Sequence, residues 1–329
     1  MSDSLPSVTV IIPTRPDGGE PKAVVAARAL DYPPDKLEII IARGRQPSVQ
    51  RNVALRAAKG ELVYFLDDDS IAAPGNLRRA VEHFRDANVQ IVGGPNVCPD
   101  DAPGLEQVFA LVLASWLAFG PSRARYTPGG TLRETGEKEL ILCNQLGRRS
   151  TMLQHGGFNE ALYPNEENAL MDDIQKAGGK LLYDPELVVY RRPRRTLKSF
   201  AKMLLTYGRG RAEQFRVNPT CGSTLNFAPP LFLVYLLTLP VLWSVNSPLE
   251  SIWFLRLYHA PLVLYVVAVM LQTMALVPQG GIGRALGAMP LMILSHLLYG
   301  AGFWRGLSTK LHRASADGPT SVTLETISP

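Results

Sequence analysis

The chain has 329 residues, of which 46% are hydrophobic and 19% charged, and its formal net charge is +5. Three widely spaced cysteines lack the spacing of metal ligands or of a disulfide framework, so we expect reduced thiols in the cytosol. The basic excess lies at residues 191–216, beside apolar segments and without interleaved base-stacking aromatic residues on a sheet, which argues against nucleic-acid binding.

The first seventy residues predict three strand-then-helix units. Apolar, β-branched runs at 8–13, 37–42 and 61–66 are typical of buried strands, and the segments near 21–30 and 48–60 between them favour helices. Repeated units of this kind predict a parallel, doubly wound α/β sheet. The ligand crevice of such a sheet lies beyond the carboxyl ends of its strands.

The third of these strands ends in three consecutive carboxylates, Asp67, Asp68 and Asp69. Adjacent negative charges repel one another unless a positive group lies among them. Mg²⁺ and Mn²⁺ are hard ions that prefer carboxylate and phosphate oxygens, so the triplet predicts a divalent-metal site. The simpler alternative is a solvated acidic turn after an ordinary strand.

The pattern continues with a helix at 76–84 and a strand at 89–92. An apolar helix at 105–119 is either core or in contact with the membrane interface. A short strand is expected at 140–144, and Glu166 and Glu167 open a helix that runs to Lys176. Strands at 180–183 and 187–190 complete a first domain, which we assign to residues 1–216.

The C-terminal third is apolar. Segments at 229–245, 258–277 and 285–304 approach the length that spans a hydrocarbon core of roughly 30 Å. We expect two to three membrane-associated helices within 227–304, preceded by a basic juxtamembrane segment at 191–216 and followed by a polar tail at 305–329. Basic residues on both flanks leave open whether one segment is interfacial or re-entrant.

Five motifs together resemble family 2 glycosyltransferases with the nucleotide-diphospho-sugar transferase (GT-A) fold. They are "VIIPT", "QRNVALRAAKGELVYFLDDDS", "GGFNE", "NEENALMDDIQKAGGKLLYDPELVVY" and "YGRGR", in that order along the chain. The resemblance is strongest to membrane-bound bacterial members that extend exopolysaccharides or lipid-linked saccharides. It runs from about residue 8 to residue 216.

The resemblance implies roles for the acidic residues. Asp69 would bind Mg²⁺ or Mn²⁺ bridging the donor diphosphate, with Asp67 near the ribose or the metal, because the leaving nucleoside diphosphate develops negative charge. Glu167 would be the general base for the acceptor hydroxyl, with Glu166 as its neighbour. Direct displacement would invert the anomeric centre. The alternative is that both glutamates only favour the positive helix N-terminus.

Further residues are implied at the donor site. They are Asp17, Arg51, Asn52 and Asp68 around the nucleotide, and Arg209 and Arg211 at the diphosphate. Guanidinium groups suit phosphate oxygens, but Arg209 and Arg211 have an equal alternative in anionic lipid headgroups.

Two departures from the family pattern affect what is transferred. No acidic residue follows the second strand, which ends Ile41-Ala42-Arg43-Gly44, where the family usually recognises uracil. The QxxRW signature of processive synthases is also absent, so we expect addition of a single sugar.

The leading hypothesis is a metal-dependent transferase on the cytosolic face of a bacterial inner membrane. It would use a nucleotide-sugar donor, with a UDP-sugar favoured, and a lipid-linked or other saccharide acceptor. One alternative is a catalytically degenerate protein that scaffolds a polysaccharide assembly. A nucleotidyltransferase is a third reading, with only a faint phosphate loop at residues 15–19.

Overall fold

The computed structural model describes residues 5–162, 164–217, 219, 221–244, 252–311 and 321–329. Two compact units divide the chain. The first comprises Met1–Asp100, Pro121–Arg192 and Leu311–Pro329, and the second Asp101–Gly120 and Pro193–Lys310. The second unit is therefore inserted twice into the sequence of the first.

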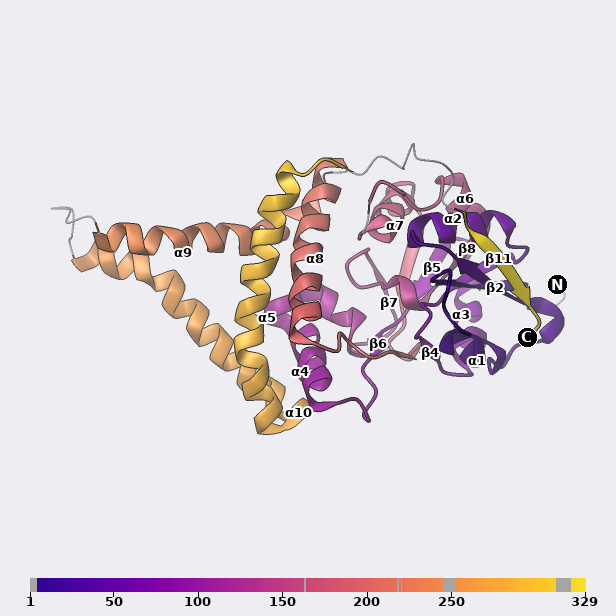
Figure 1. The fold of residues 1–329 in the computed structure, drawn as a ribbon, viewed down its shortest axis with the longest axis horizontal. Helices are drawn as coiled ribbons and strands as arrows, with labels where there is room; N and C mark the ends of the chain where they lie inside the picture. Colours follow the sequence, from indigo (N-terminus) through magenta and orange to yellow (C-terminus); the bar gives the residue numbers. More distant parts are fainter. Residues whose placement is uncertain (1–4, 163, 218, 220, 245–251, 312–320) are drawn as a thin grey trace. The chain divides into compact units, whose positions relative to one another are not determined.

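The first unit is built on an eight-stranded mixed sheet, shown in Figure 1, with the strand order β11-β2-β1-β3-β8-β5-β9-β7. Strands β2, β1, β3, β5 and β9 run parallel, and β11, β8 and β7 run against them. The strand bounds are β1 Val8–Thr14, β2 Leu37–Arg43, β3 Leu62–Phe65, β5 Val89–Gly93, β7 Arg133–Thr135, β8 Gln145–Arg148, β9 Lys180–Tyr183 and β11 Thr323–Ile327.

Helices cover both faces of this sheet because its central strands are apolar on both sides. In β1, Val10 and Ile12 face one hydrophobic core, and Ile11 between them faces the other. Helices α1 (Lys22–Arg28) and α3 (Asn76–Glu82) pack on the first core. Helices α2 (Pro47–Ala57), α6 (Arg149–Gln154) and α7 (Glu166–Lys176) pack on the second. This is the doubly wound α/β architecture that the sequence predicts.

The strand expected at 140–144 is a correction. Leu140 and Leu142 are buried in the second core, and the strand, β8, starts only at Gln145. The apolar run indicates burial but not strand pairing. Strand β8 is instead defined by its antiparallel neighbours β3 and β5 on either side.

A three-stranded second sheet lies beside the acidic loop. It consists of β4 (Ile71–Ala72), β10 (Val189–Tyr190) and β6 (Asn96–Val97). Tyr190 pairs with Ile71 in the antiparallel direction, so the residue after β10 lies opposite the residue before β4. The sheet thereby fixes the chain at Arg191 next to the loop that holds Asp69.

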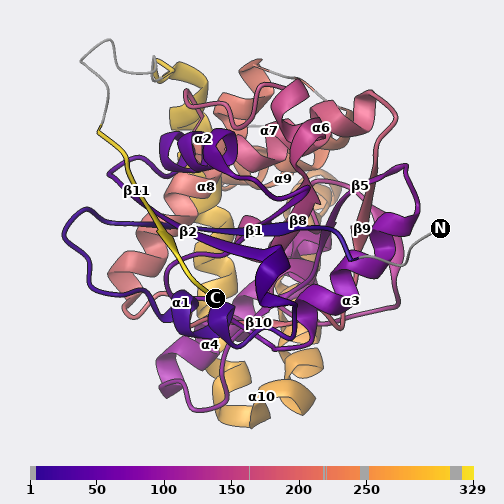
Figure 2. The same ribbon diagram turned by 90° about the vertical axis from the view of Figure 1, so that its right-hand side faces the viewer.

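The C-terminal residues return to the first unit as a strand. In Figures 1 and 2, β11 runs beside β2, with Glu325 in register with Ile41. Val322 and Leu324 pack against the second core, and Ile327 against the first. Pairing along β2 removes an unpaired edge there.

The second unit is helical. Its helices are α4 (Gly104–Leu113), α5 (Trp116–Phe119), α8 (Leu197–Val217), α9 (Ala228–Ser244) and α10 (Ile252–Ser308). Helices α8 and α10 run side by side at van der Waals contact of their backbones. A Cβ on Gly208 would lie 2.0 Å from the Tyr299 oxygen, and one on Gly302 would lie 2.1 Å from the Leu205 oxygen. Glycine is required where helices approach this closely.

Helix α10 is broken at Gly281, whose φ of 77° is left-handed. The segments Thr224–Val241 and Leu257–Ser308 are long and apolar enough to cross a membrane. A third candidate arises if the bent pair Gly104–Leu113 and Trp116–Arg125 is one span. As one helix, Leu257–Ser308 would measure roughly 78 Å, well beyond a hydrocarbon core of roughly 30 Å. The break at Gly281 divides it near the boundary that the sequence predicts between the second and third apolar segments.

Candidate active site

The acidic loop lies at the carboxyl edge of the parallel strands. Ile11 is in register with Phe65, and the Leu66 amide donates to the Ile11 oxygen at 3.2 Å. Thr14 in β1 is in register with Arg43 in β2. The ends of β1, β2 and β3 therefore form one edge, and Asp67, Asp68 and Asp69 follow directly from it.

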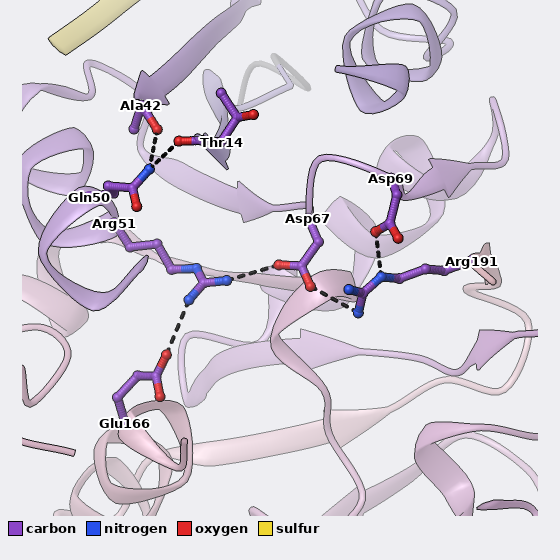
Figure 3. A network of polar contacts seen from close by, with 8 residues as sticks. All are labelled: Thr14, Ala42, Gln50, Arg51, Asp67, Asp69, Glu166 and Arg191. Carbon is purple, nitrogen blue, oxygen red and sulfur yellow. Dashed lines mark hydrogen bonds and ion pairs between the residues drawn. The ribbon is translucent and has the colours of Figure 1, made fainter. Parts of the chain in front are cut away.

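Arg51 joins the acidic loop to the start of α7, as Figure 3 shows. Its Nη2 lies 2.9 Å from Asp67 Oδ1, and its Nη1 lies 3.1 Å from Glu166 Oε1. The Arg51 side chain is 7% exposed and that of Glu166 is 3% exposed. Buried ion pairs of this kind hold their partners firmly, because removing one partner leaves the other charge uncompensated.

Arg191 occupies the other side of the acidic loop. Its Nη1 lies 3.0 Å from Asp67 Oδ2, and its Nε lies 2.5 Å from Asp69 Oδ1. Burial opposes the charge of Arg191, but Asp67 and Asp69 outweigh it and hold the Arg191 pKa well above its ordinary value. The site is thus a chain of alternating charges that runs from Glu166 through Arg51, Asp67 and Arg191 to Asp69.

Asp68 is the exposed member of the triplet. Partial burial raises its pKa, and the like charges of Asp69 and Asp67 raise it further. The three carboxylates therefore repel one another, and added positive charge would lower the electrostatic energy of the loop.

The donor set of Asp67 and Asp69 fits a divalent cation. Both carboxylates already reach one cationic group, the Arg191 guanidinium. Among the described residues there is no cluster of three or more His, Cys, Asp or Glu side chains that would enclose a metal. Two carboxylates are the usual protein share of a Mg²⁺ site whose other ligands are substrate phosphates and water.

The start of α7 presents Glu166 and Glu167 differently. Asn165 precedes them with a left-handed φ of 93°, and the Asn168 side-chain amide donates to Asn165 Oδ1 at 2.7 Å. Glu166 is buried, whereas Glu167 is partly exposed. Burial raises the pKa of Glu166 to about 8, with repulsion from Glu167 adding to the effect and Arg51 opposing it. Two adjacent carboxyl groups are thereby separated in environment.

Gln50 and Asn52 flank Arg51 on α2 and bind the protein itself. Gln50 donates from Nε2 to the Thr14 and Ala42 oxygens at 2.7 and 2.5 Å, which ties β1 to β2 at their ends. Asn52 exchanges hydrogen bonds with the Phe158 backbone and donates to Glu160 Oε1. Asn52 therefore holds the "GGFNE" turn, a role that differs from the nucleotide contact implied by resemblance.

The other predicted donor residues belong to other elements of the chain. Asp17 is exposed in the turn after β1. Arg209 and Arg211 belong to α8 of the second unit, where Arg209 Nε lies 3.3 Å from Glu213 Oε1 and Arg211 donates to Gln214. Their contact with a diphosphate stays a prediction.

Two residues of the site were missed by sequence reasoning. Arg191 was counted with the basic juxtamembrane segment, yet it pairs with the acidic loop inside the first unit. Arg43 was noted only for replacing an acidic residue, and it pairs with Glu325 Oε1 at 2.7 Å. The signal for Arg191 was its place immediately after a predicted strand, just as the "DDDS" loop directly follows another strand.

A family model described as Glycosyl transferase family 2 matches residues 17–146, which include β2, β3 and the acidic loop. Residues 17–146 are thus similar to family 2 glycosyltransferases, and the mixed α/β sheet shares the fold of a glycosyltransferase of known structure.

Two relatives and one solved structure are similar to this chain. The pre-mycofactocin glycosyltransferase of Mycobacterium tuberculosis is 28% identical over 162 residues, in both strain CDC 1551 / Oshkosh and strain ATCC 25618 / H37Rv. The match covers 49% of this chain and 33% of the relative, so the chain spans about a third of the relative's length. A mannosyltransferase from Pyrobaculum calidifontis, solved with GDP-Man and Mn²⁺, has a TM-score of 0.52 at 18% identity. It covers 89% of this chain and 86% of its own, and it shares the fold.

Proposed function

We propose that the protein is a membrane-anchored, metal-dependent, inverting transferase that adds a single sugar from a nucleotide-sugar donor to a saccharide acceptor, itself lipid-linked. The observation that carries the proposal is the pairing of Arg51 with both Asp67 and Glu166. This pairing sets the donor-side carboxylates and the α7 carboxylates on opposite sides of one guanidinium. The pairing supports a proposal in which donor and acceptor chemistry share a single site.

The metal would be held by Asp67 and Asp69. A divalent ion bound there supplies positive charge for the two phosphates of the leaving nucleoside diphosphate. The mannosyltransferase of similar fold was solved with Mn²⁺, which supports the choice of metal. Arg51 orients Asp67, since its guanidinium group bonds one carboxylate oxygen directly.

Glu167 is the proposed base. Glu166 is buried and committed to Arg51, so the more exposed Glu167 is the carboxylate that accepts the hydroxyl proton. As that proton moves to Glu167, the acceptor oxygen bonds the anomeric carbon and the bond to the diphosphate oxygen breaks. The electron pair leaves with the nucleoside diphosphate. Attack opposite the leaving group inverts the anomeric centre.

The acceptor and location are argued from the second unit. Apolar helices that could cross a membrane follow a basic segment, an arrangement suited to an acceptor with an anionic head and a hydrocarbon tail. Positive flanks favour the cytosolic face of a bacterial inner membrane. Two nucleotides are candidates for the donor. The resemblance favours UDP, whereas the mannosyltransferase of similar fold was solved with GDP-Man.

The test is nucleoside diphosphate release from a panel of UDP-, GDP- and dTDP-sugars by the detergent-solubilised chain with Mn²⁺ or Mg²⁺. A lipid-linked saccharide pool is supplied as acceptor. Turnover of one donor is expected, with Glu167→Gln lowering kcat by roughly 10²- to 10⁴-fold. Asp173→Asn is the matched control, because Asp173 is an exposed acid on the same helix. If the chain shows no turnover and no metal-dependent donor binding, the scaffold alternative is favoured instead.

A further inference from the structure

Arg191 is held in place by backbone pairing on two sides. Antiparallel pairing of Tyr190 with Ile71 brings Arg191 opposite Ser70, the residue after Asp69. On the other side the Arg191 amide donates to the Val97 oxygen at 3.0 Å. Its position beside the acidic loop is thus built into the three-stranded sheet and does not depend on a flexible surface side chain.

Arg191 and Arg51 divide the oxygens of Asp67 between them. Arg51 bonds Oδ1 at 2.9 Å, and Arg191 bonds Oδ2 at 3.0 Å while also bonding Asp69 Oδ1. The oxygens bound by Arg191 come from both proposed metal ligands. Any cation shared by Asp67 and Asp69 would compete for the same negative charge.

We propose that Arg191 is the resident counter-cation of the Asp67–Asp69 pair and is displaced when metal and donor bind together. This inference rests on the proposed function. A metal ion binding alone must break the two ion pairs of Arg191 and leave its guanidinium without an anionic partner. A donor diphosphate gives the released guanidinium phosphate oxygens to bind, since guanidinium forks match phosphate geometry.

The coupling has a thermodynamic consequence. If nucleoside diphosphate raises the affinity for metal, metal raises the affinity for nucleoside diphosphate by the same factor. The wild-type chain should therefore bind free metal weakly and bind it well only with the diphosphate present. Arg191 is a positioning residue in this scheme and takes no proton in the reaction.

The test measures Mn²⁺ binding by electron paramagnetic resonance on the full-length chain in detergent, without sugar donor. Arg191→Gln is expected to bind Mn²⁺ at least tenfold more tightly than wild type. Addition of UDP or GDP should raise the Mn²⁺ affinity of wild type by a larger factor than that of Arg191→Gln. Arg192→Gln is the matched control, because it removes the same charge from the exposed neighbouring residue.

Two further variants make the outcome decisive. Asp69→Asn should lose Mn²⁺ binding, which places the measured ion at the acidic loop. Arg191→Lys keeps the charge but lacks the fork that spans both carboxylates, so its Mn²⁺ affinity should fall between those of wild type and Arg191→Gln. Arg191→Lys also provides the comparison with wild type if Arg191→Gln does not fold.

Equal or weaker Mn²⁺ binding by both folded Arg191 variants would overturn the inference while leaving the proposed transferase activity standing. Tighter binding shared by Arg192→Gln would also overturn it, because the effect would then be one of general charge. Lack of Mn²⁺ binding in every variant would overturn the inference together with the metal dependence of the proposed function. Donor turnover in the release assay distinguishes failure of this inference alone from failure of the proposed function.

Discussion

Arg43 and Glu325 are 282 positions apart in the chain and form a two-point ion pair. Arg43 Nε lies 2.7 Å from Glu325 Oε1, and Nη2 lies 3.3 Å from Oε2. Arg43 Nη1 also donates to the Gly18 oxygen at 2.6 Å, in the turn after β1. The C-terminal strand thereby reaches the loops at the carboxyl edge of the sheet, where the nucleotide is proposed to bind.

Deletion of residues 321–329 should destabilise the first unit and expose the edge of β2. Three half-buried apolar side chains, Val322, Leu324 and Ile327, would be lost, at a cost of roughly 2–4 kcal/mol. Differential scanning fluorimetry should show a lower Tm, and light scattering should show more aggregation. Glu325→Gln keeps the strand and should lower Tm far less. An unchanged Tm after deletion would contradict the docking of β11.

Arg51 and Glu166 should be energetically coupled. Arg51→Gln leaves the buried Glu166 carboxylate without its guanidinium partner and should cost roughly 3–5 kcal/mol of unfolding free energy. The double variant with Glu166→Gln should cost less than the sum of the single variants, with a coupling energy of roughly 1–3 kcal/mol. Denaturant unfolding measures all four corners of the cycle.

Arg56→Gln provides the control for this cycle, because Arg56 is exposed on the same helix. It should change stability little and combine additively with Glu166→Gln. Additive behaviour of Arg51→Gln would show that the ion pair contributes no net stability.

Asp184 should make the first unit sensitive to acid. The side chain is fully buried and accepts hydrogen bonds from Arg79 and from the Glu186 amide, with His83 Nε2 at 2.8 Å. Burial raises its pKa, but the His83, Arg79 and Glu186 contacts outweigh this and lower it to about 2. The "YDP" element thus has a structural role in the turn that leads to β10 and Arg191.

The lowered pKa of Asp184 means that the folded protein loses stability as the pH falls. The carboxylate contributes stability that is fully present above its unfolded pKa of about 3.9 and is lost as pH falls through about 2. The contribution is roughly 2 kcal/mol. Unfolding of wild type and of Asp184→Asn, compared between pH 5 and pH 2, should show this loss only in wild type. Parallel curves for the two proteins would contradict it.

Gly208→Ala should disrupt the second unit. The new methyl would lie 2.0 Å from the Tyr299 oxygen and 2.9 Å from the Phe303 amide, so α8 and α10 would have to move apart. Overpacking of this kind costs roughly 1–3 kcal/mol or more. Thermal unfolding in detergent should show a lower Tm.

Gly283→Ala is the matched control in α10, because a Cβ at that position meets nothing within 4 Å. Alanine favours helix over glycine, so this variant should be neutral or slightly more stable. Equal behaviour of the two variants would show that Gly208 is not needed for close packing. The first glycine of "YGRGR" would then be free for another role.

The sequence alone determined the features that local patterns encode. Alternating and continuous apolar runs predict the strands that place Asp67–Asp69 at a strand end, and two glutamates before an amphipathic run predict the start of α7. The apolar C-terminal segments are likewise helical in their described parts. These depend on periodicity and on the chemistry of chain ends, which neighbouring residues carry by themselves.

Only the tertiary structure decided which charges meet. Arg191 and Asp69 are 122 positions apart, Arg51 and Glu166 are 115 apart, and Arg43 and Glu325 are 282 apart. A local pattern classifies Arg191 with its basic neighbours, because it contains no information about which strand pairs beside it. Strand pairing then decided that Arg191 faces the acidic loop, and the surrounding carboxylates made that contact favourable.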